Sequence, residues 1–266
     1  MVAKLFLVLE FVFLASAITQ IEEQIPSDFS QPETRIVGGS PTTIQSYPFA
    51  APLLLSGRLV CGSSIVSRTT LVSAASCLPT DGATNGYQVR VGSTRYNSGG
   101  RVINVIRFII NPGYNPVTID NDIGLIKVAA PIRFSATVQP ANLAPANLVI
   151  PDDLIVITIG WGAVTPVLLG NAPSEELQSV ALRTTNIARC QLINAIVDPT
   201  TKVCARATST RAEGPCNGDG GSALLFNNVV AGLTSFRNGI ATCGTLGFPT
   251  VFTRISPYLA FIRANS

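Results

Sequence analysis

Residues 216–223 read Cys-Asn-Gly-Asp-Gly-Gly-Ser-Ala, and the rest of the chain is interpreted around this stretch. Three of its eight residues are glycine, the residue type that most readily adopts the backbone conformations of a tight loop. Cys216 opens the loop, and Asp219 lies inside it. We therefore expect a tight loop anchored by a cysteine, and the motifs elsewhere in the chain indicate what surrounds it.

The composition predicts a globular, all-β protein. A chain of 266 residues with 47% hydrophobic residues can bury a large core. Only 12% of the residues are charged and the net charge is +3, which argues against nucleic acid or an anionic membrane as a partner. Short apolar runs alternate with turn residues, as in a sheet protein. The predicted strands are residues 52–55, 59–66, 70–74, 87–91, 101–110, 154–158 and 177–182.

Two short helices are predicted in the second half of the chain. Asn186 is placed to cap a helix that runs to about Leu192. Ser256 as N-cap and Pro257 at the first helical position predict a terminal helix, with apolar residues at helical spacing up to Ile262. We expect this last helix to pack on the core.

The chain contains no histidine. Base chemistry near neutral pH most often uses an imidazole, and this chain cannot supply one. Zinc is disfavoured too, because its soft ligands would have to come from the six cysteines, which have a better use in disulfides. We expect no metal and no cofactor.

The cationic residues are 15 Arg and only 3 Lys. Arginine keeps its charge at alkaline pH, where lysine begins to lose its proton. This bias fits a protein that works in an alkaline fluid, such as some insect gut lumens. Lineage or codon bias is the alternative explanation.

The N-terminal residues predict secretion. Lys4, an apolar run over residues 5–14 and the small residues Ala-Ser-Ala at 15–17 form the pattern of a signal peptide, residues 1–17. An uncleaved anchor is the alternative, but the run is shorter than the roughly 17–25 residues that span a bilayer. Residues 18–35 are polar and read as a pro-segment. We expect an extracellular protein.

The spaced motifs resemble those of the chymotrypsin/trypsin-like serine proteases (peptidase S1), most closely the insect secreted branch. The loop at 216–223 resembles the family's C-x-G-D-S-G-G-P, and residues 73–77 resemble T-A-A-H-C. Residues 120–126 resemble D-N-D-I-A-L-I, and residues 35–39 resemble the R-I-V-G-G activation site. The resemblance covers residues 36–266. It implies two six-stranded antiparallel Greek-key barrels with a C-terminal helix.

The resemblance implies activation by proteolysis. A trypsin-like protease would cut after Arg35, and the new amino group of Ile36 would enter the interior and pair with the Asp219 carboxylate. A buried charge needs such a partner because an isolated one is very costly.

The catalytic positions depart from the family pattern. Ser76 replaces the base histidine and Gly220 replaces the nucleophilic serine, so of the triad only Asp122 is retained. With no imidazole to orient, Asp122 is expected to hold loop backbone as a buried polar tether. The backbone N–H groups of Gly218 and Gly220 remain as the implied oxyanion hole.

Six cysteines after a signal peptide imply disulfides, with 15 possible pairings. Free thiols are the alternative. The resemblance selects one pairing: Cys61–Cys77, Cys190–Cys204 and Cys216–Cys243.

The resemblance also places a specificity pocket. Gly214 lies where trypsins carry an acidic pocket floor, so a preference for Arg or Lys is not supported. Phe236 occupies a position that forms the pocket wall in the family. Arg237 and Thr250 fall where the family has glycines, and both add bulk. We expect a narrowed or filled pocket. Alternatively, Arg237 points to solvent and the pocket survives.

The sequence therefore predicts a secreted, monomeric, catalytically inactive serine protease homologue. It would act by binding a protease, an inhibitor or a peptide. The alternative is a working chymotrypsin-like serine endopeptidase, in which Ser76 and Gly220 are sequence errors or are bypassed, for example by Ser222.

Overall fold

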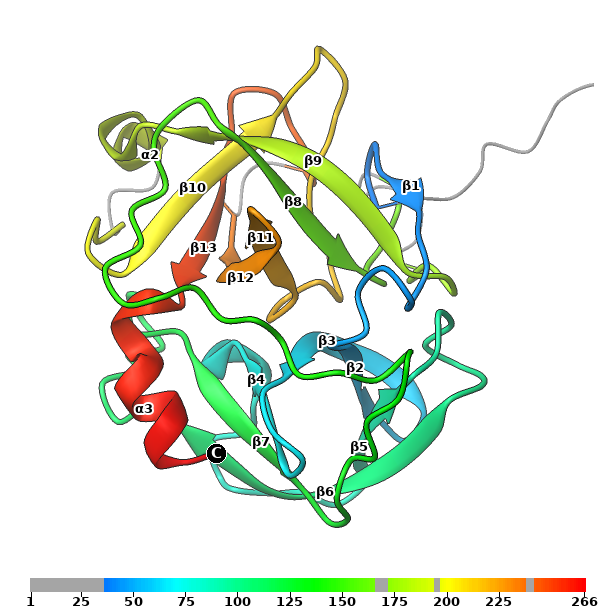
Figure 1. Ribbon diagram of the computed structural model, residues 1–266. Coiled ribbons are helices and arrows are strands. Elements are labelled where there is room, and N and C mark those ends of the chain that lie inside the picture. Colours follow the sequence, from blue (N-terminus) through cyan, green and yellow to red (C-terminus); the bar gives the residue numbers. More distant parts are fainter. Residues whose placement is uncertain (1–35, 166–171, 194–196, 238–241) are drawn as a thin grey trace, which may run out of the picture. The chain divides into compact units, whose positions relative to one another are not determined.

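The computed structural model describes residues 36–165, 172–193, 197–237 and 242–266. The first half of these residues forms a closed antiparallel barrel with strand order β2-β3-β4-β7-β6-β5, and β5 pairs back onto β2 (Figure 1). Its strands are β2 (Ala50–Leu55), β3 (Arg58–Ile65), β4 (Thr70–Ser73), β5 (Tyr87–Val91), β6 (Arg101–Ile110) and β7 (Gly124–Val128).

The second half forms a second antiparallel barrel. Its strand order is β9-β10-β13-β12-β11-β8, closed by pairing of β8 with β9, and the short β1 (Ser40–Pro41) adds to the outer edge of β9. The two six-stranded barrels predicted from the sequence are thus confirmed. The strands are β8 (Ile155–Gly160), β9 (Gln178–Thr185), β10 (Lys202–Ala207), β11 (Ala223–Phe226), β12 (Val229–Phe236) and β13 (Thr250–Arg254).

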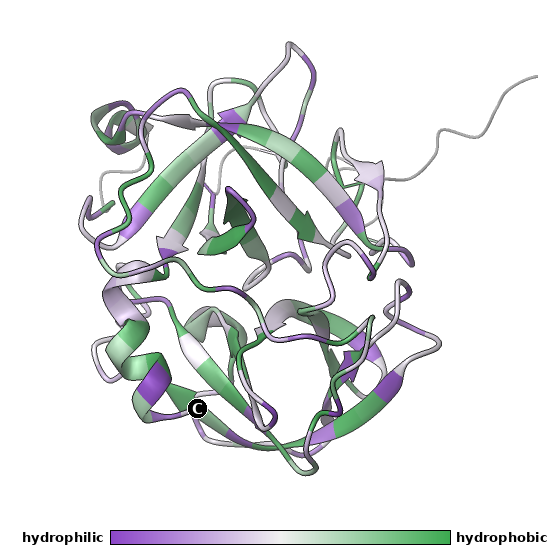
Figure 2. Cartoon of the chain, in the orientation of Figure 1, coloured by the Kyte–Doolittle hydropathy of each residue, from purple (hydrophilic) through white to green (hydrophobic). Residues whose placement is uncertain are grey.

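Each barrel encloses its own apolar core. Along β9, alternate residues from Gln178 to Leu182 are buried, which is the period of two that puts one face of a strand inside a barrel. Figure 2 shows apolar residues along most strands of both barrels. Leu53, Ile65, Leu71, Val89, Ile103 and Ile126 fill the first core; Ile36, Val156, Leu182, Leu224 and Phe252 fill the second.

A third cluster joins the barrels. Val72 and Leu125 of the first barrel pack in one group with Trp161 and Leu233 of the second. Because the two barrels share this cluster, the loops at their junction are held on both sides.

The helical segments are short. They are η1 (Ala75–Cys77), α2 (Ile187–Ile193), η2 (Ser256–Tyr258) and α3 (Leu259–Ala264). Asn186 caps α2 as predicted, because its Oδ1 accepts the N–H of Ala188 at 2.8 Å. Leu259 and Ile262 of α3 are buried in the shared cluster. Figure 1 shows the helix beside β7. Lys127 Nζ of β7 donates a hydrogen bond to the Asn265 carbonyl, just after the helix, at 3.2 Å.

The predicted Ser256 cap is wrong. The terminal segment begins as a 3₁₀ turn, Ile255 is at the N-cap position, and no side chain caps the segment. Ser256 Oγ instead accepts a weak bond from Arg254 Nη2 at 3.5 Å. Ile255 already has helical backbone angles, so the cap geometry that serine needs does not arise.

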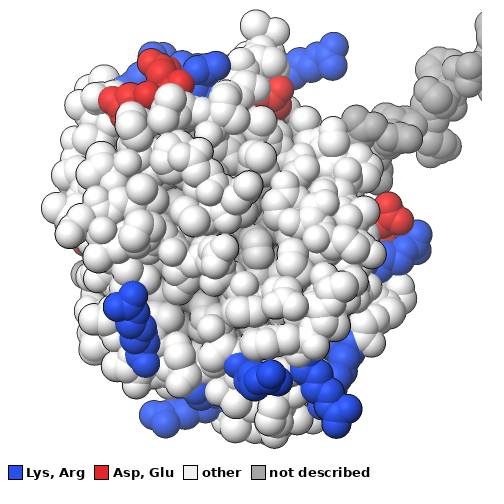
Figure 3. Space-filling view, in the orientation of Figure 1, with Lys and Arg blue, Asp and Glu red and all other residues white. Residues whose placement is uncertain are grey.

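Charges on the face seen in Figure 3 lie mostly at its margins. None of the helices in the described residues has the length and apolar character needed to cross a membrane. The predicted signal peptide and pro-segment lie outside the described residues.

Candidate functional site

A cavity of about 260 Å³ lies where the two barrels meet. The first barrel contributes Cys61 from the middle of β3 and the turn η1, and the second contributes the loop at 215–220, the end of β12 and the start of β13. The cavity is lined by Cys61, Ser76, Cys77, Pro215, Cys216, Asn217, Gly218, Gly220, Thr234, Ser235, Phe236, Arg237 and Thr250.

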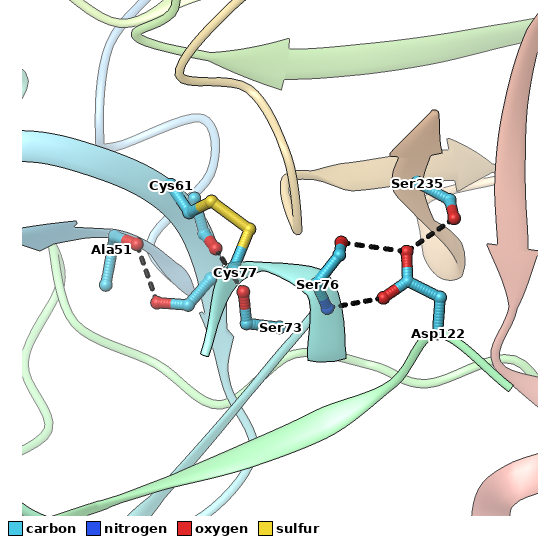
Figure 4. The surroundings of a disulfide bond; sticks show 9 residues. Ala51, Cys61, Ser73, Ser76, Cys77, Asp122 and Ser235 are labelled. Atoms are coloured by element: carbon cyan, nitrogen blue, oxygen red, sulfur yellow. Dashed lines mark hydrogen bonds between the residues drawn. A yellow bond between two sulfur atoms is a disulfide. The ribbon is translucent and has the colours of Figure 1, made fainter. Parts of the chain in front are cut away.

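Asp122 lies behind this cavity and is fully buried. One carboxylate oxygen accepts the Ser76 N–H at 2.7 Å (Figure 4). The other accepts the Ser76 hydroxyl at 3.1 Å and the Ser235 hydroxyl at 2.5 Å. The carboxylate thus ties η1 to β12, which is the geometry of a buried polar tether. The Ser76 hydroxyl donates a hydrogen bond to this carboxylate and offers no basic group near neutral pH.

The three predicted disulfides are confirmed: Cys61–Cys77, Cys190–Cys204 and Cys216–Cys243, with no free cysteine. The first holds η1, which carries Ser76, against β3, as Figure 4 shows. The third anchors the loop at 216–223 to residue 243. Two of the three bridges therefore brace the cavity.

Gly220 faces the first disulfide. A Cβ at position 220 would lie 2.9 Å from Cys77 Sγ and 3.2 Å from Cys61 Sγ, so a side chain there needs a small local shift. The N–H groups of Asp219, Gly221 and Ser222 are each bonded to a backbone carbonyl. Within the described residues, the N–H groups of Gly218 and Gly220 have no such acceptor. These two amides remain available to a ligand.

Ser222 does not line the cavity. Its side chain is buried, and its Oγ lies 2.0 Å from the position that a Cβ on Gly62 would take. A serine packed this closely against β3 has no access to a peptide in the cavity. The geometry does not support Ser222 as a substitute nucleophile.

Asp219 is buried and carries no cation as a partner within the described residues. Its carboxylate accepts the N–H groups of Gly162 at 2.7 Å and Cys216 at 2.9 Å. Burial raises the pKa of Asp219 to about 7, and the two backbone bonds oppose that rise. The carboxylate therefore lies in a setting where a positive charge would be strongly stabilised.

Ile36 is fully buried in the core of the second barrel, and Val37 forms a bridge with Gly214. No hydrogen bond or ion pair joins Ile36 to Asp219 in this uncleaved chain, and Arg35 lies outside the described residues. The pairing that cleavage would create stays a prediction.

Sequence reasoning missed Lys202, which is only 2% exposed. Its Nζ donates to the Ile119 carbonyl at 2.7 Å, to Thr253 Oγ1 at 3.0 Å and to Ser235 Oγ at 3.2 Å. Burial lowers the pKa of Lys202 to about 8, against the pull of Asp122 and two other carboxylates. The sequence signals the burial of Lys202 only weakly: the residue precedes an apolar run, and the chain has just 3 lysines.

The predicted pocket residues Phe236, Arg237 and Thr250 line the cavity, whereas Gly214 lies just beyond it. Arg237 does not simply point to solvent: its Nη2 donates to Asn217 Oδ1 at 3.1 Å, so the side chain reaches from β12 to the loop at 216–223. Burial lowers the pKa of Arg237. The cavity is present; that the added bulk narrows it stays a prediction.

In the described ranges, no three His, Cys, Asp or Glu residues come together in a way that could hold a metal ion. The chemistry available in the cavity is that of hydroxyls, free amides and one guanidinium.

Known proteins are similar to this chain in sequence and in fold. The family model described as Trypsin matches residues 36–262. Trypsin CFT-1 of Choristoneura fumiferana is 38% identical over 242 residues, which cover 88% of this chain and 92% of that protein. Trypsin, alkaline B of Manduca sexta is 38% identical over 240 residues, which cover 87% and 91%.

Two solved structures have a fold similar to that of this chain. Mouse neuropsin, a serine protease, superposes with a TM-score of 0.76 at 27% identity, over 86% of this chain and 99% of its own. Human heparin binding protein superposes with a TM-score of 0.74 at 25% identity, over 86% and 96%.

Proposed function

Because the chain belongs to the trypsin family of serine proteases, we propose that it is a secreted, catalytically inactive member that binds a protein or peptide in its cleft. One observation carries this proposal: the cavity presents glycine at position 220 and serine at position 76, in a chain without histidine. Peptide cleavage by this family needs a hydroxyl that attacks and an imidazole that takes its proton.

The hydroxyls that remain do not replace this pair. Ser76 and Ser235 both donate hydrogen bonds to Asp122, and no imidazole is present to take the proton of either hydroxyl, because the chain contains no histidine. What remains of the catalytic machinery is the pair of free amides at Gly218 and Gly220. In the serine protease template, a site reduced to its oxyanion hole and its binding contacts still accelerates hydrolysis by roughly 10³–10⁴-fold over the reaction in water.

The architecture for binding is retained. The cavity is present, two disulfides brace it, and the amides of Gly218 and Gly220 have no backbone acceptor within the described residues. The proposed ligand is a protease, an inhibitor or a peptide that lies in the cleft as a substrate would. The proposed route to the mature form is signal-peptide removal after residue 17, followed by cleavage after Arg35 by a trypsin-like protease.

The test uses the secreted protein after cleavage at Arg35. It is incubated with a broad peptide-substrate mixture and with a fluorophosphonate probe, beside an active trypsin at equal concentration. We expect neither turnover nor labelling above the buffer control. Turnover or labelling at the level of the active trypsin, retained after repurification, would refute the proposal.

The names of the relatives favour a second candidate, a serine endopeptidase, since several are called trypsins. It requires residues 76 and 220 to be errors in the sequence, or a different nucleophile. Sequencing both codons from independent transcripts decides the first possibility. The burial of Ser222 argues against the second.

A further inference from the structure

We propose that the cleft recognises a carboxylate: an aspartate or glutamate side chain of the bound peptide or protein segment, seated against Arg237 and Thr234. The inference rests on the binding role proposed above and specifies its ligand. It begins from two polar atoms that the protein itself leaves without partners.

Arg237 Nε and Thr234 Oγ1 are both buried, and neither has a hydrogen-bond partner within the described residues. Both residues line the same cavity. Thr234 is 6% exposed, and its backbone N–H is already bonded to the Ser222 carbonyl, so only the hydroxyl is free. Buried polar groups are nearly always satisfied, so these two atoms are hydrogen-bonding capacity that the protein leaves unused beside the cavity.

The charge of Arg237 is also uncompensated. Within the described residues its one hydrogen bond is to the neutral amide of Asn217, and no aspartate or glutamate is among the residues that line the cavity. Asp122 lies behind Ser76 and Ser235, and the cation of Lys202 lies on the far side of Ser235. Asp219 is turned toward Gly162 and Cys216. The charged group that faces the cavity is therefore a cation.

A carboxylate fits this setting better than a phosphate. A guanidinium donates several hydrogen bonds in one plane and matches the planar carboxylate. One arginine neutralises one negative charge, whereas a doubly charged phosphate needs a second cation, and none lines the described cavity. The free amides of Gly218 and Gly220 then suit the carbonyl oxygen of the same peptide.

The experiment measures peptide binding to the full secreted protein by fluorescence anisotropy. Labelled peptides, acetylated and amidated at their ends, differ only in a central Glu, Gln, Lys or phosphoserine. A further peptide with a central Gln and a free C-terminus tests whether a terminal carboxylate suffices. We expect the Glu peptide to bind at least about tenfold more tightly than the Gln peptide, the factor expected of one charge-assisted bidentate contact.

Arg237→Gln should abolish this preference, and Arg237→Lys should restore part of it. Arg263→Gln, on the exposed side of α3, is the matched control and should retain the preference. Unchanged thermal midpoints establish that the variants are folded. Because Arg237 is partly exposed at the cleft, we expect these changes to leave the fold intact.

The outcomes separate the two proposals. Equal affinity for the Glu and Gln peptides, or tighter binding of the phosphoserine peptide, overturns the carboxylate inference and leaves the binding role standing. A preference that survives Arg237→Gln overturns the assignment to Arg237. Hydrolysis of the Glu peptide with the preference intact overturns catalytic inactivity and supports the carboxylate pocket.

Discussion

Lys202 and Asp122 are linked through one serine hydroxyl. Lys202 Nζ lies 3.2 Å from Ser235 Oγ, and the same hydroxyl donates to Asp122 at 2.5 Å. The Asp122 carboxylate thus accepts hydrogen bonds from Ser76 and Ser235, and the buried cation of Lys202 bonds the hydroxyl of the same Ser235. A charge in the interior is tolerated only with such partners, so the link accounts for two buried charges at once.

The burial of Lys202 predicts a pH-dependent stability. Its folded pKa of about 8 lies below its unfolded value. Between these two values the unfolded chain binds more protons, so the free energy of unfolding rises with pH from about 8 to 10.5. We expect wild type to gain on the order of 2–3 kcal/mol over this range relative to Lys202→Met.

Urea unfolding at pH 7, 8.5 and 10 measures this difference. The comparison with the variant removes the contribution of tyrosines that titrate at high pH. Lys127→Met, on β7, is the matched control and should follow wild type. Parallel curves for wild type and Lys202→Met would contradict the prediction.

Asp219 predicts the opposite slope in the uncleaved chain. Its folded pKa of about 7 lies above its unfolded value, so the stability that it contributes is present at low pH and is lost as pH rises from about 4 to 7. Relative to Asp219→Asn, we expect the uncleaved protein to lose about 2–4 kcal/mol between pH 4.5 and 7.5. Denaturant titration at the two pH values measures it.

Cleavage after Arg35 should remove that slope. If the Ile36 ammonium pairs with Asp219, the carboxylate becomes stable as an ion and its pKa falls. The cleaved and uncleaved proteins are compared at pH 4.5 and 7.5. The same slope in both forms would mean that the ammonium does not reach Asp219.

The Cys61–Cys77 bridge should contribute measurable stability. It closes a loop with a sequence separation of 16, for which chain entropy predicts about 3 kcal/mol. The double change Cys61→Ser with Cys77→Ser should lower the free energy of unfolding by about that amount and raise the mobility of Ser76. Equilibrium unfolding measures the first effect and hydrogen exchange at η1 the second. A loss below about 0.5 kcal/mol, within the variation of surface substitutions, would show that the loop is held by other contacts.

Restoring the two catalytic residues tests the rest of the site. Ser76→His with Gly220→Ser should give detectable hydrolysis of peptides that carry glutamate, because Asp122 is in place to orient the imidazole and the two amides are free. Each single change should give no detectable hydrolysis. The rate should remain below that of active relatives, since a Cβ at residue 220 lies only 2.9 Å from Cys77 Sγ. Adding Asp122→Ala is the control and should remove the restored rate.

The fold could be predicted because its signals are local or spaced in a recognisable way. The runs at 87–91 and 101–110 become β5 and β6 with unchanged bounds. β9 extends to Thr185, three residues beyond its apolar run, because Thr185 pairs with Cys204 of β10. Pairing across a barrel, rather than the residues themselves, sets that end.

The site was only partly predictable. Ser76, Asp122 and Gly220 were found from motifs, but the role of Lys202 depends on partners at residues 119, 235 and 253, which are far apart in the chain. The direction of Arg237 was equally hidden, because it is fixed by Asn217, a neighbour across the cleft. Contacts between distant segments produce no periodic pattern in the sequence, so they cannot be predicted from it.

The positions of residues 76 and 220 have an evolutionary consequence. Both lie at the rim of the cavity and outside the three large apolar clusters. Substitutions there leave the packing of these apolar clusters unchanged and act on the contacts of the cleft instead. Under the proposed inactivity, two substitutions in a duplicated gene are enough to remove cleavage while the barrels and disulfides that shape the cleft are kept.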